Sequence, residues 1–252
     1  VREHAMGAIS NGLALSGLHP FASTFLTFSD YLKPAIRLSC LMNLGVTYIF
    51  THDSLSIGED GPTHQPVEQL IALRSIPNLT VIRPCDANEI IGAYKYIMSN
   101  VTGPTALILS RNEVPIQDST SIHDITKGGY IIRKERKNLS AIIIASGEEV
   151  QIALEAASRL EEKGYDIRVI SMPSIELWHK QKEKYKEELL PLGVKTFVIE
   201  ASSSYSWHEF VYNDKYLINM NRFGSSASKD DLYHSYGFDV DSVVTKIENL
   251  LK

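Results

Sequence analysis

The densest group of side chains that could do chemistry lies between residues 51 and 65. It contains two histidines, His52 and His64, and the carboxylate Asp60 among other polar residues. An apolar run precedes the group and reads as a buried strand, and a stretch with helical spacing follows it from Pro66 onward. Ligands of parallel α/β sheets bind outside the carboxyl ends of strands, and a glycine-bearing loop that enters a helix can receive an anion. We therefore expect a polar substrate pocket here.

Each of these side chains also has a structural interpretation. A single histidine on a loop is commonly a capping or surface residue, and Asp60 could stabilise the turn before Gly61. A zinc site is not favoured, because no cysteine or paired-histidine spacing accompanies the group. The gathering of the three residues on one strand-end loop nevertheless favours function.

Aromatic residues recur every third position at Phe25, Phe28 and Tyr31. They could pack in the core, or they could form a wall on which a planar heterocycle stacks. Glu3 lies near the chain start, where a lone glutamate is ordinarily a solvated surface group.

Short β-branched runs alternate with longer helical stretches along the chain. We expect strands at residues 46–51, 79–82, 105–109, 141–145, 166–171, 195–200 and 216–220, and helices at 5–15, 31–42, 66–74, 88–98, 148–163 and 240–251. This alternation predicts an α/β fold of two domains, each a mainly parallel sheet with helices on both faces. A polar stretch with Pro115 and a Gly-Gly pair indicates a linker at 119–134, between domains at 1–118 and 135–252.

Composition limits the partners of the chain. The net charge is −5 over 252 residues and no Lys/Arg block stands out, so neither nucleic acid nor a membrane surface is expected as a partner. Cys40 and Cys85 form no CxxC pattern, which favours a reducing cytoplasm.

Several motifs, taken in order, resemble the transketolase family. They are VREH at residues 1–4, TFLTFSDY at 24–31, HDS at 52–54, GEDGPTH at 58–64 and LILSR at 107–111. The GEDGPTH run is the most specific of these, and the resemblance continues through residues 145–150, 169–173 and 236–238. It therefore covers essentially the whole chain.

The resemblance implies an enzyme of the pentose phosphate pathway. Such an enzyme moves a two-carbon ketol unit from a ketose phosphate, such as xylulose 5-phosphate, to an aldose phosphate. It uses thiamine diphosphate with Mg²⁺, and its active sites form between the subunits of a cytoplasmic homodimer.

The resemblance also implies roles for single residues on the cofactor side. Glu3 matches the catalytic carboxyl group that hydrogen-bonds N1′ of the aminopyrimidine, and its pKa is expected to be raised in an assembled site. Phe25, Phe28 and Tyr31 match the aromatic pocket around that ring, with Phe28 stacked on it.

On the substrate side, the resemblance assigns four residues. His64 matches the group that hydrogen-bonds the sugar where negative charge develops, and is the second catalytic residue. Asp60 matches the group that reads a donor hydroxyl. His52 and Arg111 match the pair that binds the substrate phosphate.

The family's GDG motif, which holds the metal and the diphosphate, does not occur in this sequence. No metal ligand is therefore expected here, and the resemblance implies a diphosphate domain that would precede Val1. We expect the pyrimidine domain to be truncated at its start, and the chain alone to bind cofactor weakly and to be inactive. The alternatives are another thiamine-dependent enzyme, such as deoxyxylulose-phosphate synthase or the β-subunit of a 2-oxo-acid dehydrogenase, a subunit of a split enzyme, or a non-catalytic assembly module.

Overall fold

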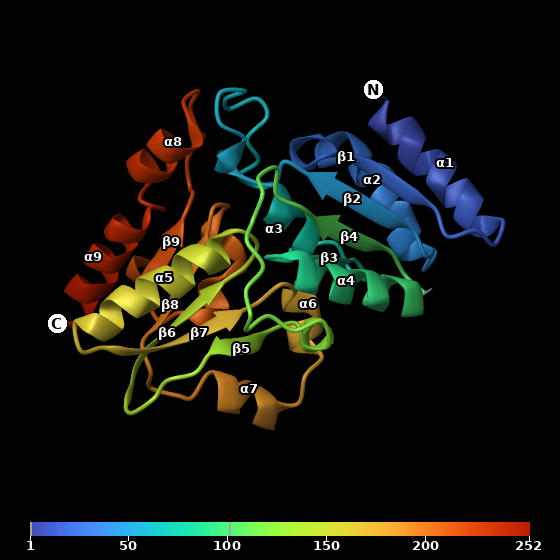
Figure 1. Cartoon of the computed structure of the whole chain (residues 1–252). Coiled ribbons are helices and arrows are strands. Elements are labelled where there is room, and N and C mark those ends of the chain that lie inside the picture. Colours follow the sequence, from blue (N-terminus) through green and yellow to red (C-terminus); the bar gives the residue numbers. More distant parts are fainter. Residues whose placement is uncertain (1, 101) are drawn as a thin grey trace.

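The first part of the chain forms a four-stranded sheet (Figure 1). We call this sheet, together with the helices around it, the N-terminal domain. The computed structural model describes residues 2–100 and 102–252. All strand pairs of this sheet are parallel, in the order β1-β2-β4-β3. The strands are β1 (Phe21–Phe25), β2 (Thr47–Thr51), β3 (Thr80–Ile82) and β4 (Thr105–Ile108), and the helices are α1 (Glu3–Leu15), α2 (Ser29–Leu41), α3 (Gln69–Arg74) and α4 (Ala87–Ser99).

The second part forms a five-stranded sheet, the C-terminal domain, in the order β5-β7-β6-β8-β9. Only β5 runs antiparallel, against β7. Its strands are β5 (Tyr130–Arg133), β6 (Leu139–Ala145), β7 (Asp166–Ser171), β8 (Thr196–Glu200) and β9 (Leu217–Asn219), and its helices are α5 (Glu149–Glu162), α6 (Ile175–His179), α7 (Glu183–Leu189), α8 (Lys229–Tyr236) and α9 (Val240–Leu251). The predicted α/β class, with two domains of mainly parallel sheet, is confirmed.

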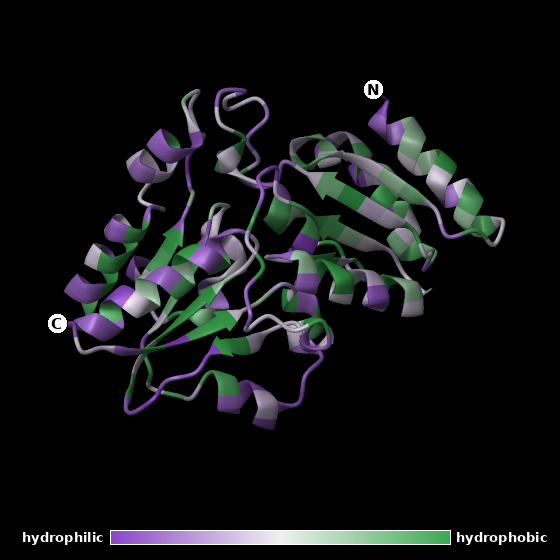
Figure 2. Ribbon diagram, in the orientation of Figure 1, coloured by the Kyte–Doolittle hydropathy of each residue, from purple (hydrophilic) through white to green (hydrophobic). Residues whose placement is uncertain are grey.

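Burial explains why these segments became strands. From Ala141 to Ala145, every residue of β6 is completely buried, as expected for a parallel strand covered on both faces. Figure 2 shows hydrophobic strands in both sheets, helices with hydrophilic bands in the C-terminal domain, and an α1 that is largely hydrophobic. No helix in the described part of the chain is long and apolar enough to cross a bilayer.

Several elements differ from the expectation, and α6 and α8 were not predicted. β1 was not predicted, because Ala22 is its only buried residue and the strand therefore has no apolar periodicity. β5 lies inside the segment interpreted as a linker. The helix expected from Pro66 begins only at Gln69.

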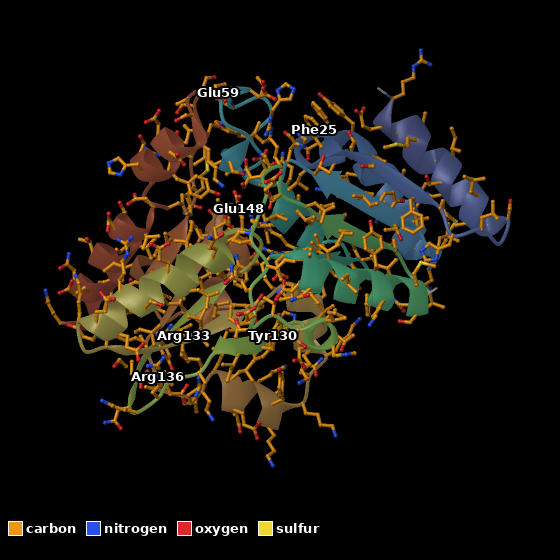
Figure 3. The ribbon with its side chains drawn as sticks, in the orientation of Figure 1. Phe25, Glu59, Tyr130, Arg133, Arg136 and Glu148 are labelled. Atoms are coloured by element: carbon orange, nitrogen blue, oxygen red, sulfur yellow. The ribbon has the colours of Figure 1, made fainter. Side chains whose placement is uncertain are left out.

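The carboxyl ends of the two sheets face each other, and this arrangement positions the site. Arg83 follows β3 in the first sheet, and its Nη1 lies 2.5 Å from Glu149 Oε2 at the start of α5. Arg74 at the end of α3 forms an ion pair of 2.8 Å with Glu200, the last residue of β8. In Figure 3, Glu148 lies between the two domains, below the loop that carries Glu59.

Candidate active site

The site begins where β1 and β2 end side by side. Phe25 and Thr51 are partners in the parallel register, so the next residue, His52, lies against Phe25. Their ring centroids are 3.6 Å apart at an interplanar angle of 18°. Arg111 follows β4, the other neighbour of β2, at the same edge. Parallel strands thus bring residues far apart in sequence to one edge of the sheet.

The backbone of His52 is in the left-handed region, with φ of 60°. A residue with a Cβ rarely adopts this conformation, which costs on the order of 1 kcal/mol and is found preferentially at functional sites. The ring is held by the stack on Phe25 and by a hydrogen bond of 2.9 Å between Nδ1 and Thr51 Oγ1. The His52 ring is therefore held at the edge of the sheet by a backbone conformation that costs energy.

The three aromatic residues form a row of stacked rings. Phe25 and Phe28 are 6.1 Å apart at 13°, and Phe28 and Tyr31 are 6.0 Å apart at 21°. Phe25 and Phe28 are half-buried, and Tyr31 is 63% exposed. Leu26 and Leu32 fill the core instead, so the core interpretation of the aromatic residues is wrong. The row offers ring faces to a planar ligand.

His64 returns to this row from the far end of the loop. Its ring meets Phe28 edge-on at 5.5 Å and Phe25 at 6.3 Å, and its Nδ1 lies 2.9 Å from Thr63 Oγ1. Asp60 is exposed on the same loop, and the turn there is closed by the backbone bond from Gly61 N to the Gly58 carbonyl at 3.1 Å. We call residues 52–65 the 52–65 loop; it rises between β1 and α8 (Figure 1).

The charges around His52 suit an anion. Burial lowers the pKa of His52 below its ordinary 6.5, the positive charge of Arg111 lowers it further, and Asp60 and Asp53 act in the opposite direction. At neutral pH the imidazole is therefore mainly uncharged. A phosphate bound beside Arg111 would stabilise the imidazolium form and could recruit a second positive charge.

Glu3 is the first residue of α1 and is only 8% exposed, so the interpretation as a solvated surface group is wrong. Its position is fixed by the close packing of α1 on α2. A Cβ on Gly7 would lie 2.5 Å from Leu32 Cδ2, and Asn11 Nδ2 donates to the Ala35 carbonyl at 2.9 Å. Among residues 2–100 and 102–252, no hydrogen bond or ring contact joins Glu3 to the aromatic row.

A metal site does not appear in the described part of the chain, since no three His, Cys, Asp or Glu side chains gather there as they would around an ion. The groups near the sheet edge that could hold an organic cofactor are the ring faces of the aromatic row and the buried carboxyl group of Glu3.

Sequence reasoning missed the residues beneath the 52–65 loop. Arg83 is completely buried, and its Nε donates to Asp53 Oδ2 at 2.8 Å while Nη1 meets Glu149. These partners are 30 and 66 residues away in the chain, so no local periodicity links them. The available signal was Asp53 itself, a carboxylate directly after a buried strand.

Comparison with known proteins gives consistent matches over both domains. Residues 1–117 match the family described as "Transketolase, pyrimidine binding domain", and residues 128–239 match "Transketolase-like TK C-terminal domain". The chain is 46% identical over 257 residues to the transketolase of Bacillus subtilis (strain 168), a match that covers 100% of this chain and 38% of that protein.

Two solved structures extend this comparison. A transketolase from Leishmania mexicana superposes with a TM-score of 0.95 at 42% identity, covering 100% of this chain and 37% of that one. A split-gene transketolase, described as an "inactive beta4 tetramer", matches with a TM-score of 0.81 at 25% identity, covering 100% of this chain and 82% of that one. The chain thus spans about 38% of the length of the Bacillus relative.

Proposed function

This chain belongs to the transketolase family, and we propose that it supplies the pyrimidine-binding and C-terminal parts of a thiamine-diphosphate-dependent transketolase. The observation that carries the proposal is the half-exposed aromatic row with two histidines at one sheet edge. We assign residues 1–118 to pyrimidine binding, the segment from 119 up to β5 to the connection, and β5 with residues 135–252 to the C-terminal domain.

The residues present fit the pyrimidine end of the cofactor. Thiamine diphosphate, when bound, supplies the carbanion-stabilising chemistry that moves a two-carbon unit. Phe28, the middle ring of the aromatic row, would stack on the pyrimidine and fix its orientation. Glu3 is buried, and its carboxyl group would hydrogen-bond N1′ of the pyrimidine. We propose that Mg²⁺ and the diphosphate are held outside this chain, which has no GDG motif.

The other polar residues of the edge fit a sugar phosphate. Arg111 and His52 would bind the phosphate, because Arg111 is a permanent cation and His52 gains a proton more readily beside an anion. His64 would donate to the sugar oxygen on which negative charge develops. Asp60, exposed on the same loop, would accept from a donor hydroxyl.

We further propose the setting in which this site works. The enzyme would be a cytoplasmic homodimer of the pentose phosphate pathway, with xylulose 5-phosphate among its ketose donors. The 252-residue chain by itself would be inactive, because the groups that bind diphosphate are not among the residues assigned here.

A chimera tests the proposal. Replacing the matching 38% of the Bacillus subtilis enzyme with this chain should give a protein that consumes xylulose 5-phosphate together with ribose 5-phosphate. Glu3→Gln should lower kcat by about 100-fold, the lower range for losing an acid–base group. Glu59→Gln, an exposed carboxylate of the loop, is the matched control and should keep kcat. A folded chimera without activity, or equal effects of the two substitutions, would contradict the proposal.

A second arrangement has one observation in its favour. The chain covers 82% of the split-gene transketolase chain, against 38% of the Bacillus enzyme. In that arrangement a separate chain would complete the same site. Mixing this chain with the separately expressed remainder of the Bacillus enzyme distinguishes the two, since activity in trans supports the split arrangement and activity only in the fusion argues against it.

A further inference from the structure

The first residues of the 52–65 loop are held from the C-terminal domain through Arg83. Arg83 Nε donates to Asp53 at 2.8 Å, and Nη1 donates to Glu149 at 2.5 Å and to the Ser146 carbonyl at 3.0 Å. Gly147 lies so close that a Cβ there would be 2.5 Å from Arg83 Cζ. The guanidinium is thus fixed on the C-terminal domain, and it in turn fixes the residue after His52.

Ser54, also near the start of the loop, contacts a second carboxylate of the C-terminal domain. Ser54 Oγ donates to Glu148 Oε1 at 3.3 Å and is 2.8 Å from Ser56 Oγ. Glu148 is itself held by Lys229 at 3.0 Å and by the hydroxyl of Tyr233 at 2.5 Å, both from α8. Ser54, Glu148 and Tyr233 are buried, and with the partly exposed Lys229 they anchor the turn that starts the loop.

The end of the loop is seated on the segment before α8. Gln65 Nε2 donates to the Gly58 carbonyl at 2.9 Å within the loop and to the Ser225 carbonyl at 3.0 Å in the C-terminal domain. A Cβ on Gly61 would lie 2.2 Å from Ser226 Oγ, and one on Gly224 would lie 1.8 Å from Gln65 Oε1. The loop therefore closes against this segment at van der Waals distance.

We propose that the C-terminal domain acts as the support that shapes the 52–65 loop, with Arg83 and Gln65 as positioning residues for His52, Asp60 and His64. The inference rests on the proposed function, in which those three residues bind the sugar phosphate. It gives the C-terminal domain, which contributes no residue to the proposed site, a direct effect on substrate affinity.

Hydrogen exchange on the 252-residue chain tests the structural half of the proposal without requiring activity. The amides of Gly58, Gly61 and His64 are bonded within the loop or next to it and report its opening. Gln65→Ala should make them exchange about tenfold faster, as expected for losing hydrogen bonds of ordinary strength. Arg83→Lys should act in the same direction, because an ammonium group cannot donate as a fork to Asp53 and Glu149 together.

Tyr130→Phe provides the matched control. The Tyr130 hydroxyl donates to Glu89 at 2.7 Å, a buried bond that also joins the two domains. In Figure 3, Tyr130 lies far from Glu59 at the tip of the loop. Tyr130→Phe should leave the loop amides unchanged even where it lowers overall stability. Unchanged loop exchange in Gln65→Ala, or equal acceleration in Tyr130→Phe, would overturn the proposal.

The kinetic half uses the chimera. Gln65→Ala should raise KM for xylulose 5-phosphate about tenfold with a smaller change in kcat, because the affected residues bind rather than transform the sugar. Tyr130→Phe should leave KM unchanged. An active chimera in which Gln65→Ala does not alter KM would overturn the positioning role, whereas an inactive chimera would count against the proposed function and leave the exchange result standing.

Discussion

Glu149 has no access to solvent, and three charged groups around it affect its protonation. Burial is the main cause that raises its pKa, Arg83 opposes it from 2.5 Å, and Glu148 and Asp53 reinforce it; together they raise the pKa from 4.5 to about 7. The ion pair with Arg83 is therefore not strong enough to keep the carboxyl group fully ionised at neutral pH. Glu149 thus holds its proton to a higher pH than an ordinary carboxyl group, among the buried charges that support the 52–65 loop.

The raised pKa of Glu149 predicts a pH dependence of stability. Because the folded state raises the pKa of Glu149, its contribution is fully present below pH 4.5 and is lost as the pH rises through about 7. The free energy of unfolding should fall by about 3 kcal/mol between those limits from this group alone. Glu149→Gln should flatten the fall, which urea denaturation at a series of pH values can measure. Parallel stability curves for the two proteins would contradict the assignment.

Asp86, the N-cap of α4, ties that helix to the segment that leads out of the N-terminal domain. Its Oδ1 accepts from Glu89 N at 3.0 Å, and its Oδ2 accepts from Gln117 N at 2.9 Å and from the Thr120 hydroxyl at 2.6 Å. Asp86 is completely buried. One carboxylate therefore both starts a helix and fixes a polar loop that has little apolar surface of its own.

Asp86→Ala should destabilise the chain by about 3 kcal/mol, because it removes a helix cap and also the buried acceptor of the Gln117 amide and of the Thr120 hydroxyl. Asp239 caps α9 from a half-exposed position, accepting from Ser242 N at 3.0 Å. Asp239→Ala is the matched control and should cost only about 1 kcal/mol. Urea unfolding midpoints measure both. Equal losses would mean that the bonds to the outgoing segment add nothing to stability.

Elements with a strong apolar pattern were predictable, and edge elements were not. The fully buried runs of β6 and β8 were identified within a residue or two of their observed bounds. β5 pairs at a sheet edge with alternating burial over four residues, too short a pattern to separate from a loop. α8 is mostly polar, with Leu232 and Tyr233 as its only buried residues. Such segments take their structure from tertiary contacts.

The residues of the candidate site likewise fall into those that the sequence could predict and those that it could not. The location of His52 and His64 on a strand-end loop followed from the apolar run before them, whereas the choice between core and pocket for Phe28 came from the family resemblance. The support beneath the loop could not be predicted, because Gln65 and Ser225 are 160 residues apart in the chain. A sequence shows which residues could react more readily than which residues hold them in place.

Buried charges and a shared core join the two domains into one unit. Leu55 and Val67 belong to the hydrophobic cluster around β6, and Leu177 joins the cluster beneath α4. Between these clusters, both nitrogens of the Arg74 fork reach Glu200, at 2.8 and 2.9 Å, and the guanidinium lies 5.2 Å from the Trp207 ring centroid. The contacts between the domains are thus buried from solvent, like those within each domain.

We therefore expect the described chain to unfold in a single transition, and Arg74 to be required for it. Burial alone would raise the pKa of Glu200, but Arg74 and Arg83 outweigh it and hold the pKa well below its ordinary value. Arg74→Met leaves that buried carboxylate short of its main partner, a loss of about 3 kcal/mol located at the domain boundary. Scanning calorimetry should then resolve two transitions, with a calorimetric enthalpy larger than the van't Hoff enthalpy.

Arg168 offers the comparison that separates a boundary effect from general destabilisation. It is also buried and charged, but its partners Glu135, Glu188 and Leu189 all lie in the C-terminal domain. Arg168→Met should lower the transition temperature while keeping one transition, because it weakens a single domain and leaves the boundary intact. If both variants unfold in one step, Arg74 does not couple the domains. If both unfold in two, the coupling depends on the stability of the C-terminal domain rather than on the boundary contact.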